Sequence, residues 1–429
     1  MTDGAPSDSE PDASPTGDDP APPVDHVVDL LRDEIDDAGA VGFVAVGADT
    51  PDVRYLSGSA TVGDRAVVLT PTDVALSLPP TTPFDGGDPV ESPLPVARRT
   101  GDTPVGRHAA ALLSDLLGGD ADDPTGRDDA ADPGEVGGTV LVPRDLPHDA
   151  ALYLDRAGYD LASTPALATA RASKTPGERD RLCEAQRVAA GGLGRVASKV
   201  DPDDDDRADL DTDSLRTAVR TALAAAGAVG VDRVALSPTD ASESTEPLDP
   251  RRPLVVELAP RLPSGYHARF VRTLVADSRG GWERRAHVAV TSALRVAAGE
   301  LEPGVDADAV RREAVAELGS FGFTPSTGTG GDGATTGDGP DTTDTDADVG
   351  TDAVADVYGV GLAAREPPLP ERGESVPAGA VVAVDAAVRD AEEGAVRVAD
   401  LLVVGEDETT TLVDLPRSLN PTVYRDFDP

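Results

Sequence analysis

Apolar positions repeat at the spacing of one helix face in several segments of the chain. Val27, Leu30, Leu31 and Ile35 follow this spacing, and Gly39 comes after them as a candidate C-cap. The same periodicity predicts helices over residues 108–117, 150–156, 215–225, 282–298 and 310–318. Helices therefore occur along the whole chain.

One helix start is marked by its own residues. Thr175 is a good N-cap, Pro176 suits the first helical position, and Glu178 completes a capping box at the third. These residues predict a long helix that runs from Thr175 to about Val196.

Short runs of β-branched residues predict the strands. In the first part of the chain they cover residues 41–46, 66–69, 74–78 and 139–142. Because helices alternate with them, we expect a mixed sheet with helices packed on it. In the second part they cover residues 254–258, 270–275, 381–384, 396–398 and 401–404. Long helices precede antiparallel strands twice there, so the predicted fold class is α+β.

Four segments lack apolar periodicity. Residues 1–23 consist mostly of Asp, Ser, Pro, Gly and Ala and predict a disordered acidic tail. Residues 119–138, 201–213 and 324–353 are acidic or of low complexity, and the last is expected to be an insert that forms a surface loop. The total length of 429 residues favours more than one domain.

The net charge is far from zero. The chain has 79 acidic and 37 basic residues, a net charge of -42, and only two lysines, Lys174 and Lys199. Such a chain repels itself in dilute buffer, whereas molar salt screens the repulsion. We therefore expect a cytosolic protein of an extreme halophile that requires molar salt to fold. Nonspecific nucleic-acid binding is excluded because it needs clustered Lys and Arg. A largely disordered acidic chain is excluded by the periodic apolar segments.

The single cysteine, Cys183, excludes an internal disulfide and a CxxC zinc site. It falls in a helical pattern, where a packed thiol is expected. No apolar run approaches the length of a membrane span, and residues 1–23 lack the features of a signal peptide. The predicted location is therefore the cytoplasm, with no membrane partner.

Three segments resemble one known family. They are Pro51–Gly58, the stretch that holds Arg171, Lys174 and Glu178, and Leu301–Val310. In this order and spacing they resemble the pita-bread metallopeptidases, which include methionine aminopeptidase, Xaa-Pro aminopeptidase, prolidase and creatinase. The resemblance implies a creatinase-like α/β N-terminal domain over residues 24–172. It also implies a pita-bread domain over residues 173–429, with the insert at 324–353.

The family binds two divalent ions through two Asp, one His and two Glu, and the ions activate a bridging water. Gly265, Tyr266, Arg272 and Thr273 match the pattern around the first two ligands, and Gly359, Gly361, Leu362, Glu366 and Pro368 match the pattern around the histidines. The five ligand positions then fall on Leu258, Arg269, Tyr358, Asp385 and Ala399, and the second, catalytic histidine falls on Arg365.

These residue types do not suit a metal site. Leu258 and Ala399 offer no donor atom, and Arg269 stays cationic. Tyr358 is a poor ligand, because the ordinary pKa of a tyrosine is about 10. Only Asp385 keeps a carboxylate. Glu257 lies one residue before the first position, and on a strand this shift turns its side chain to the other face unless a bulge intervenes.

The resemblance therefore implies a scaffold without catalytic residues, metal or other cofactor. The favoured function is non-catalytic binding of a peptide or protein chain in the vestigial cleft. The alternative is an active metal-dependent Xaa-Pro aminopeptidase or dipeptidase. The natural ligand and the oligomeric state stay open.

A guanidinium at a ligand position offers the remaining carboxylate a bidentate partner. We expect Arg269 to occupy the space of the metals and to pair with Asp385, with Glu366 joining them and Arg365 nearby. The alternative is that Arg269 points to solvent.

Other catalytic constellations find no support in the sequence. The histidines form no HExxH pair, and His267 is expected to be a polar strand residue rather than a ligand. No phosphate-binding loop and no GxSxG elbow is present. The aspartate runs lack calcium-loop spacing and are expected to be solvated surface. The five histidines are His26, His108, His148, His267 and His287.

Overall fold

The computed structural model describes most of the chain after residue 23. The described residues are 24–48, 50–58, 63–80, 94–118, 137–201, 210–231, 234–237, 247–325 and 352–425. The predicted tail and most of the three low-complexity runs lie outside these residues. Some described edges of the runs are regular: Thr212 begins a helix, and residues 324–325 and 352–353 lie in strands, so both described ends of the predicted insert belong to the sheet rather than to a loop.

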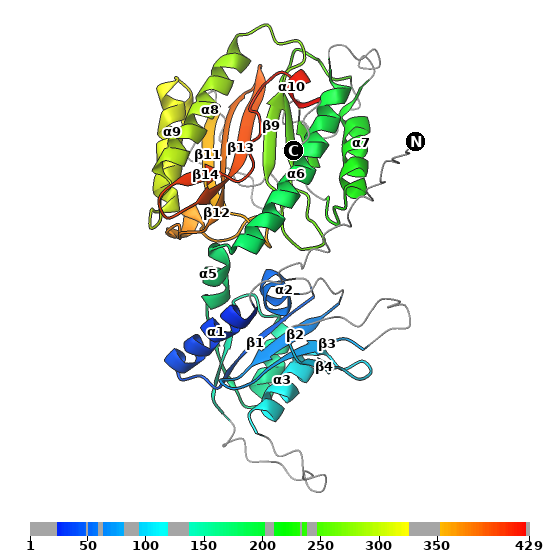
Figure 1. Ribbon diagram of the computed structural model, residues 1–429, viewed down its shortest axis with the longest axis vertical. Helices are drawn as coiled ribbons and strands as arrows, with labels where there is room; N and C mark the ends of the chain where they lie inside the picture. Colours follow the sequence, from blue (N-terminus) through cyan, green and yellow to red (C-terminus); the bar gives the residue numbers. More distant parts are fainter. Residues whose placement is uncertain are drawn as a thin grey trace, which may run out of the picture.

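The first half of the chain, residues 24–172, forms a six-stranded mixed sheet in the order β4-β3-β2-β1-β5-β6 (Figure 1). β1 pairs antiparallel with β2 and parallel with β5, as expected for a mixed sheet. Helices and strands follow one another as α1 Val24–Ala38, β1 Gly42–Gly47, α2 Pro51–Ser57, β2 Arg65–Leu69, β3 Val74–Leu78, β4 Val96–Arg98, α3 Val105–Leu116, β5 Thr139–Val142, α4 His148–Arg156, β6 Asp160–Ser163 and α5 Ala166–Ala172.

The second half, from residue 173, forms an eight-stranded sheet in the order β10-β11-β12-β13-β9-β8-β7, with β14 paired to β13. Its ladders are antiparallel except for β10 with β11. The elements are α6 Pro176–Lys199, α7 Thr212–Ala225, β7 Val234–Ser237, β8 Leu254–Leu258, β9 Phe270–Leu274, α8 Trp282–Glu300, α9 Ala307–Ser320, β10 Thr324–Pro325, β11 Asp352–Gly359, η2 Pro370–Arg372, β12 Val381–Asp390, β13 Gly394–Val404, β14 Thr409–Thr411 and α10 Thr422–Arg425.

Helix α6 begins where its residues predict. The Thr175 hydroxyl accepts a hydrogen bond from the Glu178 backbone N–H, and the Glu178 carboxylate accepts one from the Thr175 backbone N–H. This reciprocal capping box satisfies two N–H groups that the first helical turn leaves unpaired. The helix runs slightly beyond the predicted end near Val196.

Several elements differ from the prediction. The two short strands expected at residues 396–398 and 401–404 are one strand, β13, which pairs along its length with β12. No element was predicted within residues 51–58, where Pro51–Ser57 form α2. A seven-residue helix is too short to display two turns of apolar spacing, so its pattern is weak. In the described part of the chain, no helix combines the length and apolarity that a membrane span needs.

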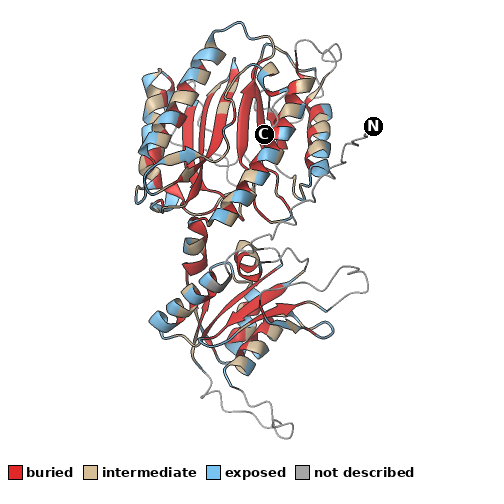
Figure 2. Ribbon diagram, in the orientation of Figure 1, coloured by how far each residue is buried: buried red, intermediate tan, exposed pale blue. Residues whose placement is uncertain are grey.

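The two halves share one hydrophobic core. Phe43, Tyr55 and Leu56 of the first half belong to the same buried cluster as Leu182, Tyr266 and Val360 of the second. Separate clusters lie beneath α8 and α9 and beneath α6 and α7. Buried strands therefore lie against helices in each half, as Figure 2 shows.

Helix α2 docks the first half onto the second at a glycine. Arg54 donates a hydrogen bond from Nη1 to the Pro263 carbonyl, 3.2 Å away. Its side chain passes so close to Gly265 that a Cβ there would lie 2.3 Å from Arg54 Cδ, and Gly265 has a φ of 91°. The positive φ favours glycine at this position, and the Arg54 side chain would have to move to make room for a larger residue.

Candidate functional site

Four residues form one row across the second sheet. The registers of β12, β13, β9 and β8 align Asp385 with Ala399, Ala399 with Val271, and Val271 with Glu257. Directly paired residues on adjacent strands point to the same face. Two carboxylates, Asp385 and Glu257, therefore lie at opposite ends of a row whose middle is small and apolar.

Two arginines fill the space above this row. Arg269 Nη2 lies 2.6 Å from Asp385 Oδ2, and Arg269 Nη1 also pairs with Glu257. Arg397 is bidentate to Asp385, with Nε 2.7 Å from Oδ1 and Nη2 2.6 Å from Oδ2, and its Nη1 lies 2.9 Å from Glu257 Oε2. We call Glu257, Arg269, Asp385 and Arg397 the arginine–carboxylate cluster. The predicted pairing of Arg269 with Asp385 is confirmed, and the solvent-facing alternative is wrong.

The cluster is buried and balanced in charge. The side chains of Arg269 and Asp385 are only 4% and 5% exposed. Burial alone would raise the pKa of Asp385, but the guanidinium groups of Arg397 and Arg269 outweigh it and hold this pKa at about 2. The carboxylate of Asp385 is therefore ionised at any ordinary pH. Burial lowers the pKa of Arg269, but the carboxylates of Asp385 and Glu257 outweigh it and raise this pKa well above its usual value.

Leu258 does not join the cluster. It is fully buried and packs in the core beneath α6, on the opposite face from Glu257. Leu258 pairs with Phe270 and Arg261 bridges His267, so one register runs through this hairpin without a bulge. The expectation that Glu257 turns away from the site unless a bulge intervenes was wrong. In this register Arg269 falls opposite Ala259, which places it on the face of Glu257.

Tyr358 and Arg365 form a neighbouring group. Tyr358 is buried on β11, and burial raises the pKa of its hydroxyl well above the ordinary value, so it is neutral. The guanidinium of Arg365 lies 4.3 Å from the centre of its ring. Arg365 Nη1 lies 2.6 Å from Asp356 Oδ2, and Nη2 lies 2.8 Å from Glu371 Oε2. Asp356 pairs with Asp385 across the β11–β12 ladder, and the sequence analysis did not single it out.

Glu366 belongs to a different network. Its Oε1 lies 2.7 Å from Lys174 Nζ, and its Oε2 lies 3.6 Å from Arg171 Nε. Arg171 Nη1 lies 2.6 Å from Asp52 Oδ1 on α2. We call Asp52, Arg171, Lys174 and Glu366 the junction network, because it joins the two halves. The expectation that Glu366 accompanies Arg269 and Asp385 was wrong, since two cations that precede α6 hold it elsewhere.

The cluster does not fit a pair of divalent ions. Such ions need several carboxylate or imidazole donors directed at one point. Here guanidinium nitrogens occupy the space between Glu257 and Asp385, and Ala399 places a methyl group in the same row. Across the described residues, no group of three His, Cys, Asp or Glu side chains is placed to hold one metal ion.

A large cleft lies between the two halves. It has a volume of about 1030 Å³ and is lined by residues of both halves, including Arg144 and Arg171 on one side and Arg365 and Arg372 on the other. We call it the junction cleft. Its volume is in the range of ligand pockets, roughly 300–1,000 Å³.

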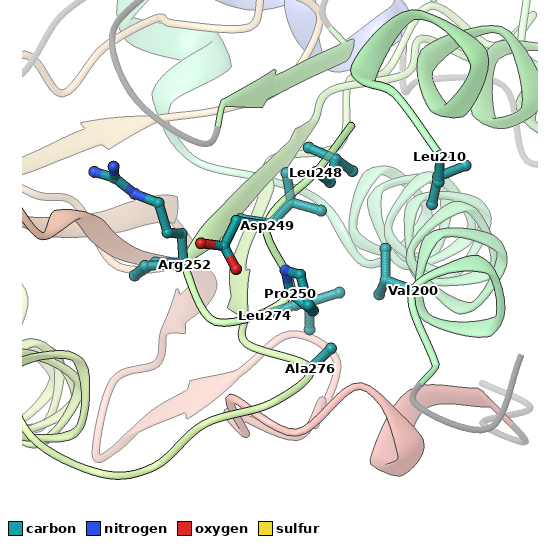
Figure 3. A pocket seen from close by; sticks show the side chains of 10 residues that line it. Val200, Leu210, Leu248, Asp249, Pro250, Arg252, Leu274 and Ala276 are labelled. Carbon is teal, nitrogen blue, oxygen red and sulfur yellow. The ribbon is translucent and has the colours of Figure 1, made fainter. Parts of the chain in front are cut away.

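A second pocket is too small to be a candidate site. It lies where α6 ends beside β8 and β9, and its volume is about 30 Å³. Figure 3 shows Val200, Leu210, Leu248 and Leu274 around it, with the side chain of Arg252 directed away. This space is comparable to the volume of one water molecule, which is about 30 Å³ in the liquid.

The remaining residues singled out in the sequence are spread over the fold. His108 Nδ1 lies 2.8 Å from the Ser77 hydroxyl, and the backbone N–H of His267 donates to the Gly361 carbonyl. Cys183 is half-buried and its thiol lies 3.5 Å from the Leu412 carbonyl, as a packed thiol would. The structure does not bring these residues together.

Several solved structures with the same fold are described as a prolidase or a dipeptidase. The chain superposes on the prolidase from Pyrococcus horikoshii OT3 with a TM-score of 0.67 and 15% identity, covering 92% of this chain and 99% of that one. The dipeptidase PepE from Mycobacterium ulcerans gives 0.67 and 20%, covering 94% and 98%. The Xaa-Pro dipeptidase from Bacillus anthracis gives 0.67 and 14%, covering 92% and 99%. At these identities the similarity establishes the two-part fold implied by the sequence, a creatinase-like half followed by a pita-bread half.

The sequence itself also matches a family. No curated protein matches the chain significantly. The model of metallopeptidase family M24 matches residues 180–406, which is slightly more than half of the 429 residues. The matched segment runs from α6 to the end of β13 and contains all four residues of the arginine–carboxylate cluster. The chain therefore belongs to metallopeptidase family M24.

Proposed function

We propose that this chain is a non-hydrolytic member of its family that binds a peptide or protein segment in the junction cleft. The observation that carries the proposal is the position of Arg269, whose guanidinium lies between the carboxylates of Glu257 and Asp385. A fixed positive charge at this point repels divalent cations and occupies the lone pairs that would bind them.

The other matched positions support the same proposal. Ala399 has no donor atom, and the Tyr358 hydroxyl is buried and neutral. The residue matched to the catalytic histidine is Arg365, which already pairs with Asp356 and Glu371. A guanidinium does not give up a proton at ordinary pH, so Arg365 is unsuited to general acid–base catalysis.

Binding is supported by the junction cleft. A shared hydrophobic core and the junction network hold its two walls together, so the cleft exists without a ligand. Preorganised sites avoid part of the entropy cost of ordering on binding.

The second candidate is an active metal-dependent Xaa-Pro aminopeptidase or dipeptidase. Family membership favours it, as do structural neighbours that include a prolidase and an Xaa-Pro dipeptidase. Three carboxylates, Glu257, Asp356 and Asp385, do lie near one face of the sheet. To free them, Arg269 and Arg397 would have to leave Glu257 and Asp385, and Arg365 would have to leave Asp356.

Metal analysis and a hydrolysis assay test the proposal. The purified chain is equilibrated with Mn²⁺, Co²⁺ or Zn²⁺ in KCl at about 2 M, where surface charges are well screened, and is then assayed on Xaa-Pro dipeptides. We expect far less than one bound ion per chain and no cleavage. Uptake of about two ions per chain, with cleavage that a chelator abolishes, would establish the peptidase instead.

The proposed location is the cytoplasm of a cell with a high internal salt concentration. The net charge of -42 and the near absence of lysine support this location, because such a surface is tolerated when salt screens it. We propose no nucleic-acid or membrane partner.

A further inference from the structure

Arg171 presents an incompletely paired guanidinium to the junction cleft. Its side chain is only 9% exposed and lies on α5, in the wall formed by the first half. Nη1 pairs with Asp52, whereas Nε is buried without a hydrogen bond, 3.6 Å from Glu366. Nη2 has no hydrogen-bond partner among the described residues. The N–H donors of a buried guanidinium are normally all hydrogen-bonded. Arg171 therefore lacks hydrogen-bond acceptors that a buried guanidinium usually has.

Arg365 presents a second guanidinium from the opposite wall. Asp356, Glu371 and the ring of Tyr358 fix its orientation. Its side chain is 28% exposed and lines the cleft, and Nε finds no hydrogen-bond acceptor within the described chain. A guanidinium held in this way keeps its orientation before a ligand arrives.

The lining of the cleft differs in charge from the whole molecule. Four arginines and four carboxylates line it, which gives a balance of zero, whereas the chain carries -42. An anionic group that most of the surface would repel is therefore not repelled here. The free donors of Arg171 and Arg365 are of the type that binds a carboxylate.

We propose that Arg171 and Arg365 make the junction cleft a site that recognises a carboxylate on its peptide ligand. This inference rests on the proposed peptide-binding function and adds the chemical group that is recognised. The carboxylate approaches between the two walls and accepts hydrogen bonds from both guanidinium groups, while Asp52, Glu366, Asp356 and Glu371 hold those groups in place.

Matched peptides test the inference on the unmodified protein. The probes are acetyl-Ala-Ala-Glu-Ala-Ala-amide and its glutamine twin, together with acetylated pentaalanine that ends in a carboxylate or an amide. Calorimetry in about 2 M KCl suppresses long-range attraction and leaves direct hydrogen bonds. We expect one of the two carboxylate peptides to bind about tenfold more tightly than its uncharged twin. A difference in affinity between the glutamate and glutamine peptides means that a side-chain carboxylate is recognised. A difference between the two pentaalanines means that the carboxylate at the chain end is recognised.

Variants then assign the effect to Arg365. In Arg365→Gln we expect the difference between the twins to fall below about threefold, because a neutral amide forms weaker hydrogen bonds to a carboxylate. Arg365→Lys keeps the charge without the planar fork and should lose most of the difference. The control is Arg312→Gln on α9, an exposed arginine outside the cleft that should leave the difference unchanged.

Equal affinity of the charged and uncharged twins for the unmodified protein overturns the inference, as does the absence of binding by all four peptides. Neither result depends on whether Arg365→Gln folds. The proposed function fails on a different result, metal-dependent hydrolysis. If the protein cleaves peptides and still prefers the carboxylate twin, the inference of carboxylate recognition holds and the proposed non-hydrolytic function is wrong.

Discussion

The arginine–carboxylate cluster and the junction network each contain two cations and two anions; all four residues of the junction network are buried, as are Arg269 and Asp385 of the cluster. They differ in what they join. The cluster links β8, β12 and β13 with the residue that precedes β9, all within one sheet, whereas the junction network ties α2 and α5 to the second half. The cluster also lies entirely within residues 180–406, which match the family, whereas only Glu366 of the junction network does.

The comparison indicates that the scaffold and the site have different requirements. The junction network holds the two halves together, and this structural role does not depend on peptide hydrolysis. In the cluster, removing metal ions alone would leave carboxylates in a buried place without compensation. Arg269 and Arg397 supply positive charge beside Asp385, so its buried carboxylate is compensated without a metal ion.

The largest effect is expected from Arg269→Ala. This change removes one of the two guanidinium groups that pair with Asp385 and opens a cavity in a buried region. We expect the free energy of unfolding to fall by about 3–5 kcal/mol, the usual cost of breaking a buried ion pair from one side. Urea unfolding in molar KCl measures it. The control Arg312→Ala removes an arginine that is 64% exposed and should cost less than about 1 kcal/mol. Equal costs for the two variants would mean that the cluster contributes no special stability.

A smaller loss is expected in the junction network. Lys174→Met keeps the length of the side chain and removes its charge, so Glu366 retains only Arg171 at 3.6 Å and the Ala363 backbone N–H at 3.4 Å. We expect unfolding to become easier by about 2–3 kcal/mol, below the full cost of an unpaired buried charge. The other lysine, Lys199, is half-buried in the last turn of α6 and provides the matched control. If the Lys174→Met and Lys199→Met proteins had the same free energy of unfolding, the ion pair of Lys174 in the junction network would not contribute to stability.

The smallest effect is expected from acid. The pKa of Asp385 is about 2 in the folded chain and 3.8 for an ordinary aspartate, so this carboxylate stabilises the fold above pH 3.8. That stability is lost as the pH falls through 2, because the folded carboxylate must then be protonated. The shift corresponds to about 2 kcal/mol. Unfolding measured between pH 5 and 2 should show a shallower acid dependence for Asp385→Asn than for the unmodified chain. Parallel curves would contradict the low pKa.

Local patterns were sufficient for the longer helices but not for the short ones, α2, α5 and α10. The capping box at Thr175 and Glu178 predicts the start of α6 because its contacts lie within one turn. The pairing of Arg269 with Asp385 was also predictable, since a charged residue in a buried site needs an opposite charge.

The faces of the strands were not predictable in the same way. Whether Glu257 or Leu258 faces the site depends on the register of β8 against β9. This register is determined by the pairing along the whole hairpin. Asp356 was missed because it precedes the matched motif and meets Asp385 only across the β11–β12 ladder. Arg397 lies in a matched segment, but its bidentate contact with Asp385 depends on the β12–β13 register.

The hydrophobic cluster shared by the two halves has a consequence for how the molecule unfolds. Phe43 and Leu56 pack in the same core as Leu182 and Val360, so neither half can unfold without exposing apolar surface of the other. Folding of the two halves is therefore thermodynamically coupled, and heat or urea should melt them in one cooperative transition. A chain cut between Ala172 and Ser173 would yield two fragments, each with an uncovered apolar face that favours reassociation over independent existence.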